Sequence, residues 1–540
     1  MLRITWNRRG VWRTTAALAV AMLVAGSVEA ERPIESGRMP PKPSVAKGLE
    51  ALGPGPLPLD RPLTGRSIGR TRAATIEEGI EACVDTYMGW YLTPGAAVAV
   101  ILDGELIFES GYGVKRSGET DPVDPDTVFA IGSVTKMMTA AAVMQQVELG
   151  RVELDAPVTD YIPEFVVGGR WPADRITVWH TLTQTTGFPD RYITDWSVCG
   201  DEAPSFWAKC QSGVKLHAPP GSFWNYSSPN FTLAGLVAER ASGRPYRDLV
   251  TESLWEPAGM NSTTFDSREV MAAGNYSNGH YHASEDDAAM DRWSVEPFGD
   301  GCPGPAAPSG GVLSTVGDLV RWALLLMDGG GPVLSSWSAS EMQRRQQGVY
   351  LTPDYFWGYS VRIDEVWGLD VLGHGGGVGG FSTELMWVPE RRFAVAVIFN
   401  SQPALASPAA SCIAEAVLDP DPVDPIDYSS DPSTWNRYAG DYVVTDDRGA
   451  STEATIFLEG DQLMGTFVDP SVPGSEFTSR LHQWWPDTFY YDSDGDGMDD
   501  TEVTFCSTRG RPGYVKWMRS RRAVGERRST PRAGGRAISP

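Results

Sequence analysis

Hydrophobic and polar residues follow two different spacings within residues 75–418, and the spacing changes from segment to segment. Apolar positions three or four residues apart predict helices, and short apolar runs bounded by turn residues predict strands. The predicted helices are Ala74–Tyr91, Ser133–Leu149, Ile176–Thr186, Asn230–Ser242, Ser314–Met327 and Leu405–Leu418. The predicted strands form two hairpins, Ala96–Leu102 with Glu105–Ser110 and Phe381–Val388 with Phe393–Asn400. Strands near both ends and helices between them predict an α+β fold with one antiparallel sheet.

The chain beyond residue 418 changes character. Residues 419–433 contain repeated Asp-Pro pairs and predict a linker. Short runs of alternating polarity within residues 434–520 predict a small all-β domain, either a barrel or a sandwich. The basic residues 521–540 predict a disordered tail.

The N-terminal residues carry the three parts of a signal peptide. Arginines between Arg3 and Arg13 precede a short apolar run, Ala16–Ala25, and Val28-Glu29-Ala30 is a suitable cleavage site. The apolar run is too short to span a bilayer, which disfavours a membrane anchor. Residues 31–74 are rich in proline and glycine and predict a disordered linker. We therefore expect cleavage of residues 1–30 after Ala30 and a secreted or periplasmic protein without a transmembrane segment.

Composition narrows the class of protein. A chain of 540 residues with 41% hydrophobic residues is folded and too long for one ordinary core. A net charge of −24 argues against nucleic acid as a partner, because phosphate binding requires a basic surface. An export signal with six cysteines favours disulfides. Cys199 and Cys210 lie close together in a polar loop, and Cys83 and Cys412 lie in the first and last helices of residues 75–418, so we predict these two pairs.

A serine opens the helix at residues 133–149, and a lysine follows it three residues later. Positions i and i+3 share one face of a helix, so the Ser133 hydroxyl and the Lys136 amine are expected to meet. A serine needs such a neighbouring base to become a nucleophile. Ser44–Lys47 and Ser212–Lys215 have the same spacing but stand among Pro and Gly residues, where no long helix can start. Ser133 is therefore the candidate nucleophile.

Two further segments carry candidate chemistry. Tyr226 precedes the helix at residues 230–242, and a tyrosine beside a lysine ammonium can act as a base. The alternative for Tyr226 is an aromatic residue that packs at a turn. The glycine-rich run Gly373–Gly380 offers unobstructed backbone N–H groups, as an oxyanion hole requires. The alternative for this run is a loop without a ligand.

Taken in order, Ser133-Val-Thr-Lys136, Tyr226-Ser-Ser228 and His374-Gly375-Gly376 resemble the motifs of the serine β-lactamase and penicillin-binding protein superfamily. The resemblance is greatest to its class C-like branch of β-lactamases, DD-peptidases, D-aminopeptidases and carboxylesterases, and it covers about residues 75–418. It implies a β-lactamase/DD-peptidase-like fold, with an antiparallel sheet flanked by helices and a helical subdomain. The small all-β domain would follow at the C-terminus.

The resemblance also implies roles. Ser133 would attack the acyl carbon, Lys136 would help to deprotonate it, and Tyr226 would act as general base and then as acid. The oxyanion would lie between the N–H groups of Ser133 and Gly377. No cofactor is implied for this chemistry.

Two positions depart from the family pattern. Ser228 stands where the family usually has Asn, and His374 stands where true class C β-lactamases have Lys. The Asn normally helps to bind a substrate amide, and the Lys supplies the cation for a β-lactam carboxylate. Both departures lower the expectation of efficient antibiotic hydrolysis and are compatible with an esterase, an amidase or a D-amino acid peptidase. Ser228, His374, Gly375 and Gly376 are expected to line the substrate site.

Two other segments raise the question of a metal. Carboxylates at alternate positions with a glycine turn suit calcium, and Asp492, Asp494, Asp496 and Asp500 follow this pattern. Glu502 is one position too early for an EF-hand, so an acidic hairpin turn is the alternative to a structural calcium site. His280 and His282, followed by two acidic residues, are interpreted as a solvated loop. His180, on an apolar helix, is interpreted as structural.

The function predicted from these features is a secreted serine hydrolase that cleaves an ester or amide through an acyl-enzyme. The substrate would be a small ester, a D-amino acid peptide or a β-lactam-like molecule, with a cell-wall origin as one option. The alternative is a catalytically weak or inactive penicillin-binding-like protein that binds cell-wall peptides. An esterase of the α/β-hydrolase type is disfavoured, because its Gly-x-Ser-x-Gly motif must lie at a turn between a strand and a helix. The one such pentapeptide of the chain, Gly65–Gly69, lies in residues 31–74, which are predicted as a disordered linker.

Overall fold

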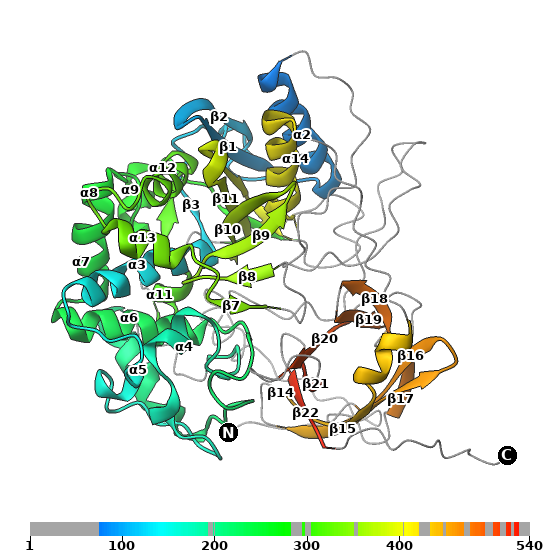
Figure 1. Cartoon of the computed structure of the whole chain (residues 1–540). Helices are drawn as coiled ribbons and strands as arrows, with labels where there is room; N and C mark the ends of the chain where they lie inside the picture. Colours follow the sequence, from blue (N-terminus) through cyan, green and yellow to red (C-terminus); the bar gives the residue numbers. More distant parts are fainter. Residues whose placement is uncertain are drawn as a thin grey trace, which may run out of the picture.

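The computed structural model describes residues 75–192, 198, 200–281, 294–296, 304–349, 355–402, 404–420, 432–446, 450–468, 476–485, 487–491, 501–507, 515–519 and 523–528. Within them, one large sheet lies between helices, and a second sheet forms a separate body at the C-terminal end (Figure 1). The predicted signal peptide with its cleavage site and the 31–74 linker lie outside the described residues.

The large sheet is antiparallel and, in the described part of the chain, has eight strands in the order β2-β1-β12-β11-β10-β9-β8-β7. Its strands are β1 Gly95–Leu102, β2 Glu105–Gly113, β7 Gln347–Gly348, β8 Tyr355–Trp357, β9 Arg362–Val366, β10 Leu369–Val378, β11 Phe381–Val388 and β12 Phe393–Phe399. Both predicted hairpins are present, and β1 pairs with β12, so the two ends of the domain meet as expected.

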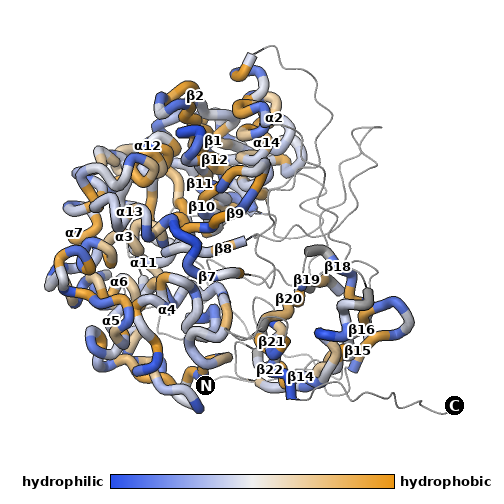
Figure 2. The backbone as a smooth tube through the Cα atoms, in the orientation of Figure 1, coloured by the Kyte–Doolittle hydropathy of each residue, from blue (hydrophilic) through white to orange (hydrophobic). Residues whose placement is uncertain are grey.

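Helices cover both faces of this sheet. The described helices are α2 Ile76–Tyr91, α3 Thr135–Glu148, α4 Val178–Leu182, α5 Ala203–Lys209, α6 Pro229–Ser242, α7 Tyr246–Val250, α8 Glu256–Ala258, α9 Ser267–Ala273, α11 Ala307–Gly310, α12 Val316–Met327, α13 Ser336–Met342 and α14 Ala406–Leu418. One face packs on α2 and α14, whereas α12 lies on the other face and joins the sheet to the helical region (Figure 1). Figure 2 shows hydrophobic residues along the central strands, which are buried on both sides.

One predicted helix is much shorter than expected. Residues 176–186 were predicted as helical, but α4 covers only Val178–Leu182. Gln184 has a left-handed backbone with φ 57°, which ends the helix. Its side-chain oxygen accepts hydrogen bonds from the Ser227 N–H at 2.9 Å and the Asn230 amide at 2.6 Å. These contacts with a distant segment hold Gln184 in a conformation that the local sequence pattern does not favour.

Two small sheets lie beside the large one in the described residues. Strand β3 Phe129–Ala130 pairs with β6 Leu313–Ser314, and β13 Ser401–Gln402 pairs with β4 Gly279–Tyr281, which in turn pairs with β5 Ser294–Glu296. His280 lies in β4 and is fully buried, with one ring nitrogen accepting from the Ser117 N–H and the other donating to the Asn400 carbonyl. The prediction of a solvated loop was therefore wrong for His280, and His282 lies outside the described residues.

The C-terminal body is one antiparallel sheet, which has nine strands in the residues described after 431. They are β14 Gly440–Asp446, β15 Ser451–Glu459, β16 Gln462–Val468, β17 Glu476–Arg480, β18 His482–Trp485, β19 Thr488–Tyr491, β20 Thr501–Ser507, β21 Val515–Arg519 and β22 Ala523–Arg527. The sheet curls on itself around an aromatic core, so the barrel alternative fits and the two-sheet sandwich does not (Figure 1). Because β22 pairs with β14, the all-β domain extends past the predicted boundary at residue 520.

A disulfide joins the two helices that cover one face of the large sheet. Cys83 in α2 and Cys412 in α14 are bonded, with Cα atoms 5.8 Å apart, which confirms that predicted pair. Cys199 lies outside the described residues, and Cys210 is an exposed free cysteine, so the predicted Cys199–Cys210 bond is not among the disulfides of the described residues.

We expect the Cys83–Cys412 bond to stabilise the larger domain, because it closes a loop of 329 residues and restricts the unfolded chain. The double variant Cys83→Ser/Cys412→Ser should lose about 4 kcal/mol of unfolding free energy. Urea denaturation followed by tryptophan fluorescence measures this loss. Cys210→Ser is the matched control, and its urea midpoint of unfolding should equal that of the wild type. Equal midpoints for all three proteins would contradict the prediction.

Candidate active site

Ser133 lies in a tight turn between the sheet and the helical region. The 3₁₀ turn Gly132–Val134 follows β3 and leads directly into α3. Gly132 adopts a left-handed backbone with φ 52°, which glycine tolerates at no steric cost. The side chain of Ser133 is half-buried at the start of a fourteen-residue helix, as the sequence pattern predicted.

Lys136 is buried beside Ser133, on the first turn of α3. Its side chain is only 1% exposed, and its Nζ lies 2.8 Å from Ser133 Oγ. The same Nζ donates to the Ser309 carbonyl oxygen at 2.8 Å, from α11. A buried amine requires such partners, because an unsatisfied polar group is costly away from water. The geometry therefore brings a basic nitrogen within hydrogen-bond distance of the candidate nucleophile.

Tyr226 lies beside Ser133 and Lys136 as the third residue of the candidate catalytic group. Its ring centroid lies 5.0 Å from Lys136 Nζ, and it precedes α6 in a loop whose backbone is fixed on both sides. The Asn225 N–H donates to the Gln184 carbonyl at 2.7 Å, and the Ser227 N–H donates to the Gln184 side chain. The structure thus brings Ser133, Lys136 and Tyr226 together, from segments that are far apart in sequence.

Ser228, the position that departs from the family pattern, stands next to an acidic residue that sequence reasoning missed. The Ser228 N–H donates to a carboxylate oxygen of Asp190 at 2.7 Å. Asp190 belongs to the loop after α4, and Tyr192 of the same loop bonds the Ser309 hydroxyl at 2.8 Å. Nothing in the local pattern of this loop marks Asp190, because its proximity to Ser228 depends on how the two loops pack.

The glycine run is the end of strand β10 rather than a loop, and it packs directly on the Ser133 turn. A Cβ on Gly376 would lie 2.1 Å from the Ile131 carbonyl oxygen and 3.3 Å from the Ser133 nitrogen. A Cβ on Gly132 would lie 2.8 Å from the Gly377 nitrogen. Only glycine permits this approach, which brings the backbones of Gly377 and the Ser133 turn together. An oxyanion hole formed by the Ser133 and Gly377 N–H groups remains a prediction.

His374 faces the same site and is only 4% exposed. Its ring lies 5.3 Å from the ring of Trp357 in β8 and 6.3 Å from that of Tyr226. Burial, with the charge of Lys136 as a smaller cause, lowers the pKa of His374 to about 3. His374 is therefore neutral at neutral pH. Its Nδ1 donates to the Gly375 carbonyl, which leaves Nε2 as a buried acceptor with no hydrogen-bond partner among the described residues.

A buried ion pair supports β10 from its other face. Glu384 in β11 stands directly opposite Gly375, and its carboxylate accepts from Arg362 in β9 at 2.8 Å. Burial opposes the charge on Arg362, but the charge of Glu384, followed by that of Asp364, holds the Arg362 pKa above its ordinary value. Because a Cβ on Gly375 would lie 3.1 Å from Glu384 Oε2, this glycine also leaves room for the carboxylate.

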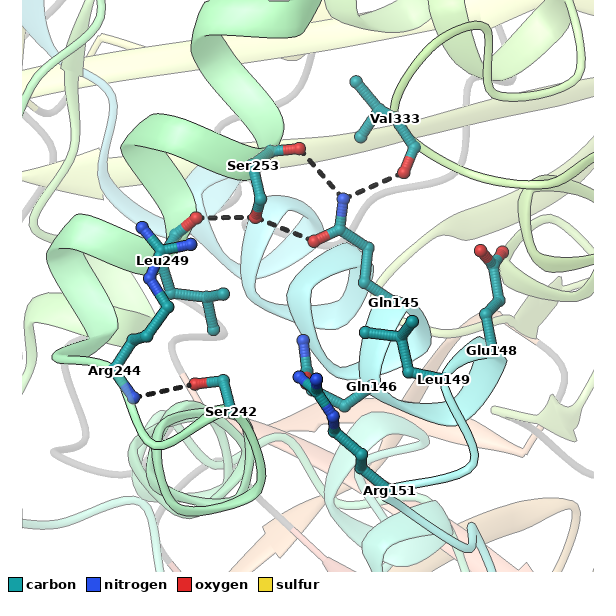
Figure 3. Close-up of a pocket in the computed structure, with 10 residues that line it drawn as sticks. All are labelled: Gln145, Gln146, Glu148, Leu149, Arg151, Ser242, Arg244, Leu249, Ser253 and Val333. Atoms are coloured by element: carbon teal, nitrogen blue, oxygen red, sulfur yellow. Dashed lines mark hydrogen bonds between the residues drawn. The ribbon is translucent and has the colours of Figure 1, made fainter.

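A separate pocket of 290 Å³ lies at the other end of α3 (Figure 3). Gln145 bridges its wall, donating to the carbonyl oxygens of Ser253 and Val333, and it accepts from the Ser253 hydroxyl at 2.8 Å. Since Ser133 precedes the first turn of α3, this pocket is about 18 Å along the helix from the candidate nucleophile. It is not part of the catalytic group.

The described residues contain no group of three or more His, Cys, Asp or Glu side chains that could hold a metal ion. The predicted calcium ligands, Asp492, Asp494, Asp496 and Asp500, lie outside the described residues, so calcium there remains a prediction without structural support.

His180 caps the start of α4 through Thr177, in agreement with a structural role. No helix in the described ranges combines the length and the hydrophobicity needed to cross a bilayer.

Comparisons with known proteins show which family the chain resembles. The family model described as Beta-lactamase matches residues 80–417. Penicillin-binding protein 4 of Amycolatopsis lactamdurans is 30% identical over 315 residues, which cover 57% of this chain and 81% of that protein. Unguisins hydrolase ungD' of Aspergillus campestris is 28% identical over 337 residues, which cover 59% of this chain and 61% of that protein.

Solved structures resemble the chain in fold. The match to the crystal structure of SurE covers 84% of this chain and 99% of the SurE chain, with a TM-score of 0.64 and 23% identity. The D-amino acid amidase from Ochrobactrum anthropi SV3, complexed with L-phenylalanine amide, covers 64% of this chain and 99% of its own, with a TM-score of 0.52 and 23% identity.

The low pKa of His374 predicts a pH-dependent stability. The unfolded chain protonates this histidine below its ordinary pKa of 6.5, whereas the folded chain keeps it neutral down to about pH 3. The unfolded state therefore binds one more proton in this window, and stability falls as the pH decreases. Relative to His374→Gln, the wild type should lose about 2.5 kcal/mol between about pH 7.5 and pH 4.5. Urea unfolding at both pH values measures it, and a constant difference between the proteins would refute it.

Proposed function

The chain belongs to the beta-lactamase family, and we propose that it is an exported serine hydrolase that cleaves an ester or amide through an acyl-enzyme at Ser133. The observation that carries the proposal is the 2.8 Å contact between Lys136 Nζ and Ser133 Oγ, with the Tyr226 ring beside the same nitrogen. A nucleophile, a buried base and a second proton carrier in one group are what acyl transfer requires.

The proposed reaction has two steps. In the first, Ser133 Oγ attacks the acyl carbon while its proton passes to the phenolate of Tyr226, with the Lys136 ammonium held beside both groups, and the C–O or C–N bond of the substrate then breaks. The leaving group takes the proton from Tyr226. In the second step Tyr226, again as phenolate, deprotonates a water molecule that attacks the acyl carbon. The ester bond to Ser133 Oγ breaks, the acid is released, and Tyr226 returns the proton to Ser133 Oγ. A cation beside the tyrosine favours the phenolate form that can act as the base.

The acyl oxygen would bind between the N–H groups of Ser133 and Gly377. The close approach of β10 to the Ser133 turn supports this assignment, because rigid backbone donors stabilise an oxyanion without reorganisation. Gly375, Gly376, His374 and Ser228 would line the remainder of the substrate site.

The neutral state of His374 bears on the choice of substrate. At this position it offers a hydrogen-bond acceptor instead of a fixed positive charge. A substrate with a free carboxylate, such as a penicillin or a peptide C-terminus, would gain no ion pair from it. We therefore favour esters, amides and D-amino acid derivatives that carry no carboxylate near the acyl group, whether of cell-wall or other origin.

The alternative, a penicillin-binding-like protein that binds cell-wall peptides without turnover, has less support. A protein that has lost catalysis usually lacks the nucleophile or its base. Here Ser133 and Lys136 are both present, with Oγ and Nζ at hydrogen-bond distance. Export from the cytoplasm is supported by the Cys83–Cys412 disulfide, since such bonds persist in oxidising compartments. Cleavage of residues 1–30 is the part of this proposal that rests on the sequence alone.

We expect a fluorophosphonate probe to label the wild type at one site per chain, because the activated Ser133 hydroxyl attacks the phosphorus. Ser133→Ala should lose both labelling and the hydrolysis of p-nitrophenyl esters. Ser212→Ala is the matched control, since Ser212 also precedes a lysine by three residues but lies in a short exposed turn. Intact mass spectrometry measures the labelling; a Ser133→Ala protein that still turns over esters would overturn the proposed mechanism.

Substrate preference gives a second test. For a matched pair of esters, one neutral and one with a carboxylate beside the acyl carbon, kcat/KM should favour the neutral ester by about tenfold. His374→Lys should narrow this ratio, because it restores a cation. Hydrolysis of nitrocefin is expected to be slower than that of the neutral esters or of D-amino acid amides. A wild type that prefers the carboxylated ester would contradict the assignment for His374.

A further inference from the structure

The C-terminal barrel contacts the loop that carries Tyr226. Strands β20 and β21 lie on the side of the barrel that faces the larger domain (Figure 1). Trp517 in β21 packs on Phe223, with ring centroids 5.5 Å apart, and both are buried in one apolar cluster with Ala218. The contact therefore covers the loop from residue 218 to residue 224, immediately before Tyr226.

A cation–π contact also joins strand β21 to the loop before Tyr226. Arg519, two residues after Trp517 on β21, places its guanidinium carbon 4.8 Å from the ring centroid of Trp224. Arg519 is 6% exposed and Trp224 is 2% exposed, so the pair is removed from solvent. A cation over an indole face is held more strongly under such conditions than at an exposed site.

Trp224 extends this contact to the catalytic group. Its ring centroid lies 6.1 Å from that of Tyr226 and 5.3 Å from that of Trp357. Trp357 in turn contacts the ring of His374 at 5.3 Å. These distances are those of directly packed aromatic pairs. Arg519 is thus separated from Tyr226 by one side chain.

The opposite side of the same loop is held by the larger domain alone. The Gly221 N–H donates to the Thr185 carbonyl at 2.7 Å, and the Asn225 N–H donates to the Gln184 carbonyl at 2.7 Å. These bonds fix the backbone, but they do not reach the Trp224 ring. That ring lies between Trp357 and Tyr355 of the larger domain and Arg519 of β21, so β21 supplies one of the contacts that hold the aromatic wall around Tyr226.

We propose that Arg519 of the C-terminal barrel is a positioning residue for the reaction, acting through Trp224 to hold Tyr226 in its catalytic orientation. The proposal rests on the proposed function for the role of Tyr226. The C-terminal domain is then a part of the catalytic unit, because Arg519 of β21 packs against the Trp224 ring that contacts Tyr226.

The test uses the full-length chain and Arg519→Met, which keeps most of the side-chain volume and removes the charge. Per active site titrated with a fluorophosphonate, kcat for a p-nitrophenyl ester should fall by about tenfold while KM stays within about twofold. Arg519→Lys should recover part of kcat, because it restores a cation over the ring. Equal kcat values for the wild type and Arg519→Met would overturn the proposal, and so would a loss confined to KM.

Arg345→Ala is the matched control. Arg345 also stands 4.8 Å from an aromatic ring, that of Phe356 in β8, but it is at the exposed edge of the sheet and paired with Asp370. Its removal should leave kcat unchanged. A similar fall in kcat for Arg345→Ala and Arg519→Met would indicate a general loss of stability and would contradict a specific role for Arg519.

Hydrogen exchange provides a readout that needs no substrate. The peptide spanning residues 218–228 should exchange faster in Arg519→Met than in the wild type, whereas peptides from α3 should not change. Equal protection of residues 218–228 overturns the proposal whether or not the chain is an enzyme. If the wild type hydrolyses no ester or amide, the proposed function fails, while faster exchange in Arg519→Met would still support the coupling between β21 and the loop.

Discussion

The burial of one amine, that of Lys136, is the constraint on which the site depends. At 1% exposure the side chain cannot use water, and its partners are the Ser133 hydroxyl, the Ser309 carbonyl and the face of Tyr226. The three come from the start of α3, from α11 and from the loop before α6. The contacts of this one nitrogen therefore join three segments, and the same arrangement places the amine within hydrogen-bond distance of the Ser133 hydroxyl.

Strand β10 of the large sheet contacts the Ser133 turn through backbone atoms rather than through side chains. Gly376 and Gly377 approach the Ile131–Ser133 segment so closely that a Cβ would collide with a carbonyl oxygen. The glycine run was interpreted from sequence as a source of accessible N–H groups, and the structure adds a second reason for the glycines, which is steric. On the other face of β10 the buried Arg362–Glu384 pair occupies the space that a side chain at Gly375 would need.

A second layer of residues holds the motifs in place, and none of them belongs to a motif. Gln184 fixes the Tyr226 loop from one side, Asp190 binds the Ser228 N–H, and Trp224 packs against Tyr226 from the other side. Arg519 brings the C-terminal barrel into this layer. Such residues have no local signature, because each acts through a contact with a segment that is distant in sequence.

The sequence by itself determined the helices α2, α6 and α14, both hairpins of the large sheet and the pairing of Cys83 with Cys412, because their signals are local or follow from the α+β order of elements. It also predicted Ser133, Lys136 and Tyr226 as one group, and the structure places these three residues together. Tertiary structure alone decided the early end of α4 at Gln184, the burial of His280, the inclusion of the glycine run in β10 and the extension of the barrel to β22. In each case, hydrogen bonds or steric contacts with distant residues outweigh the local preference, and no local sequence pattern contains them.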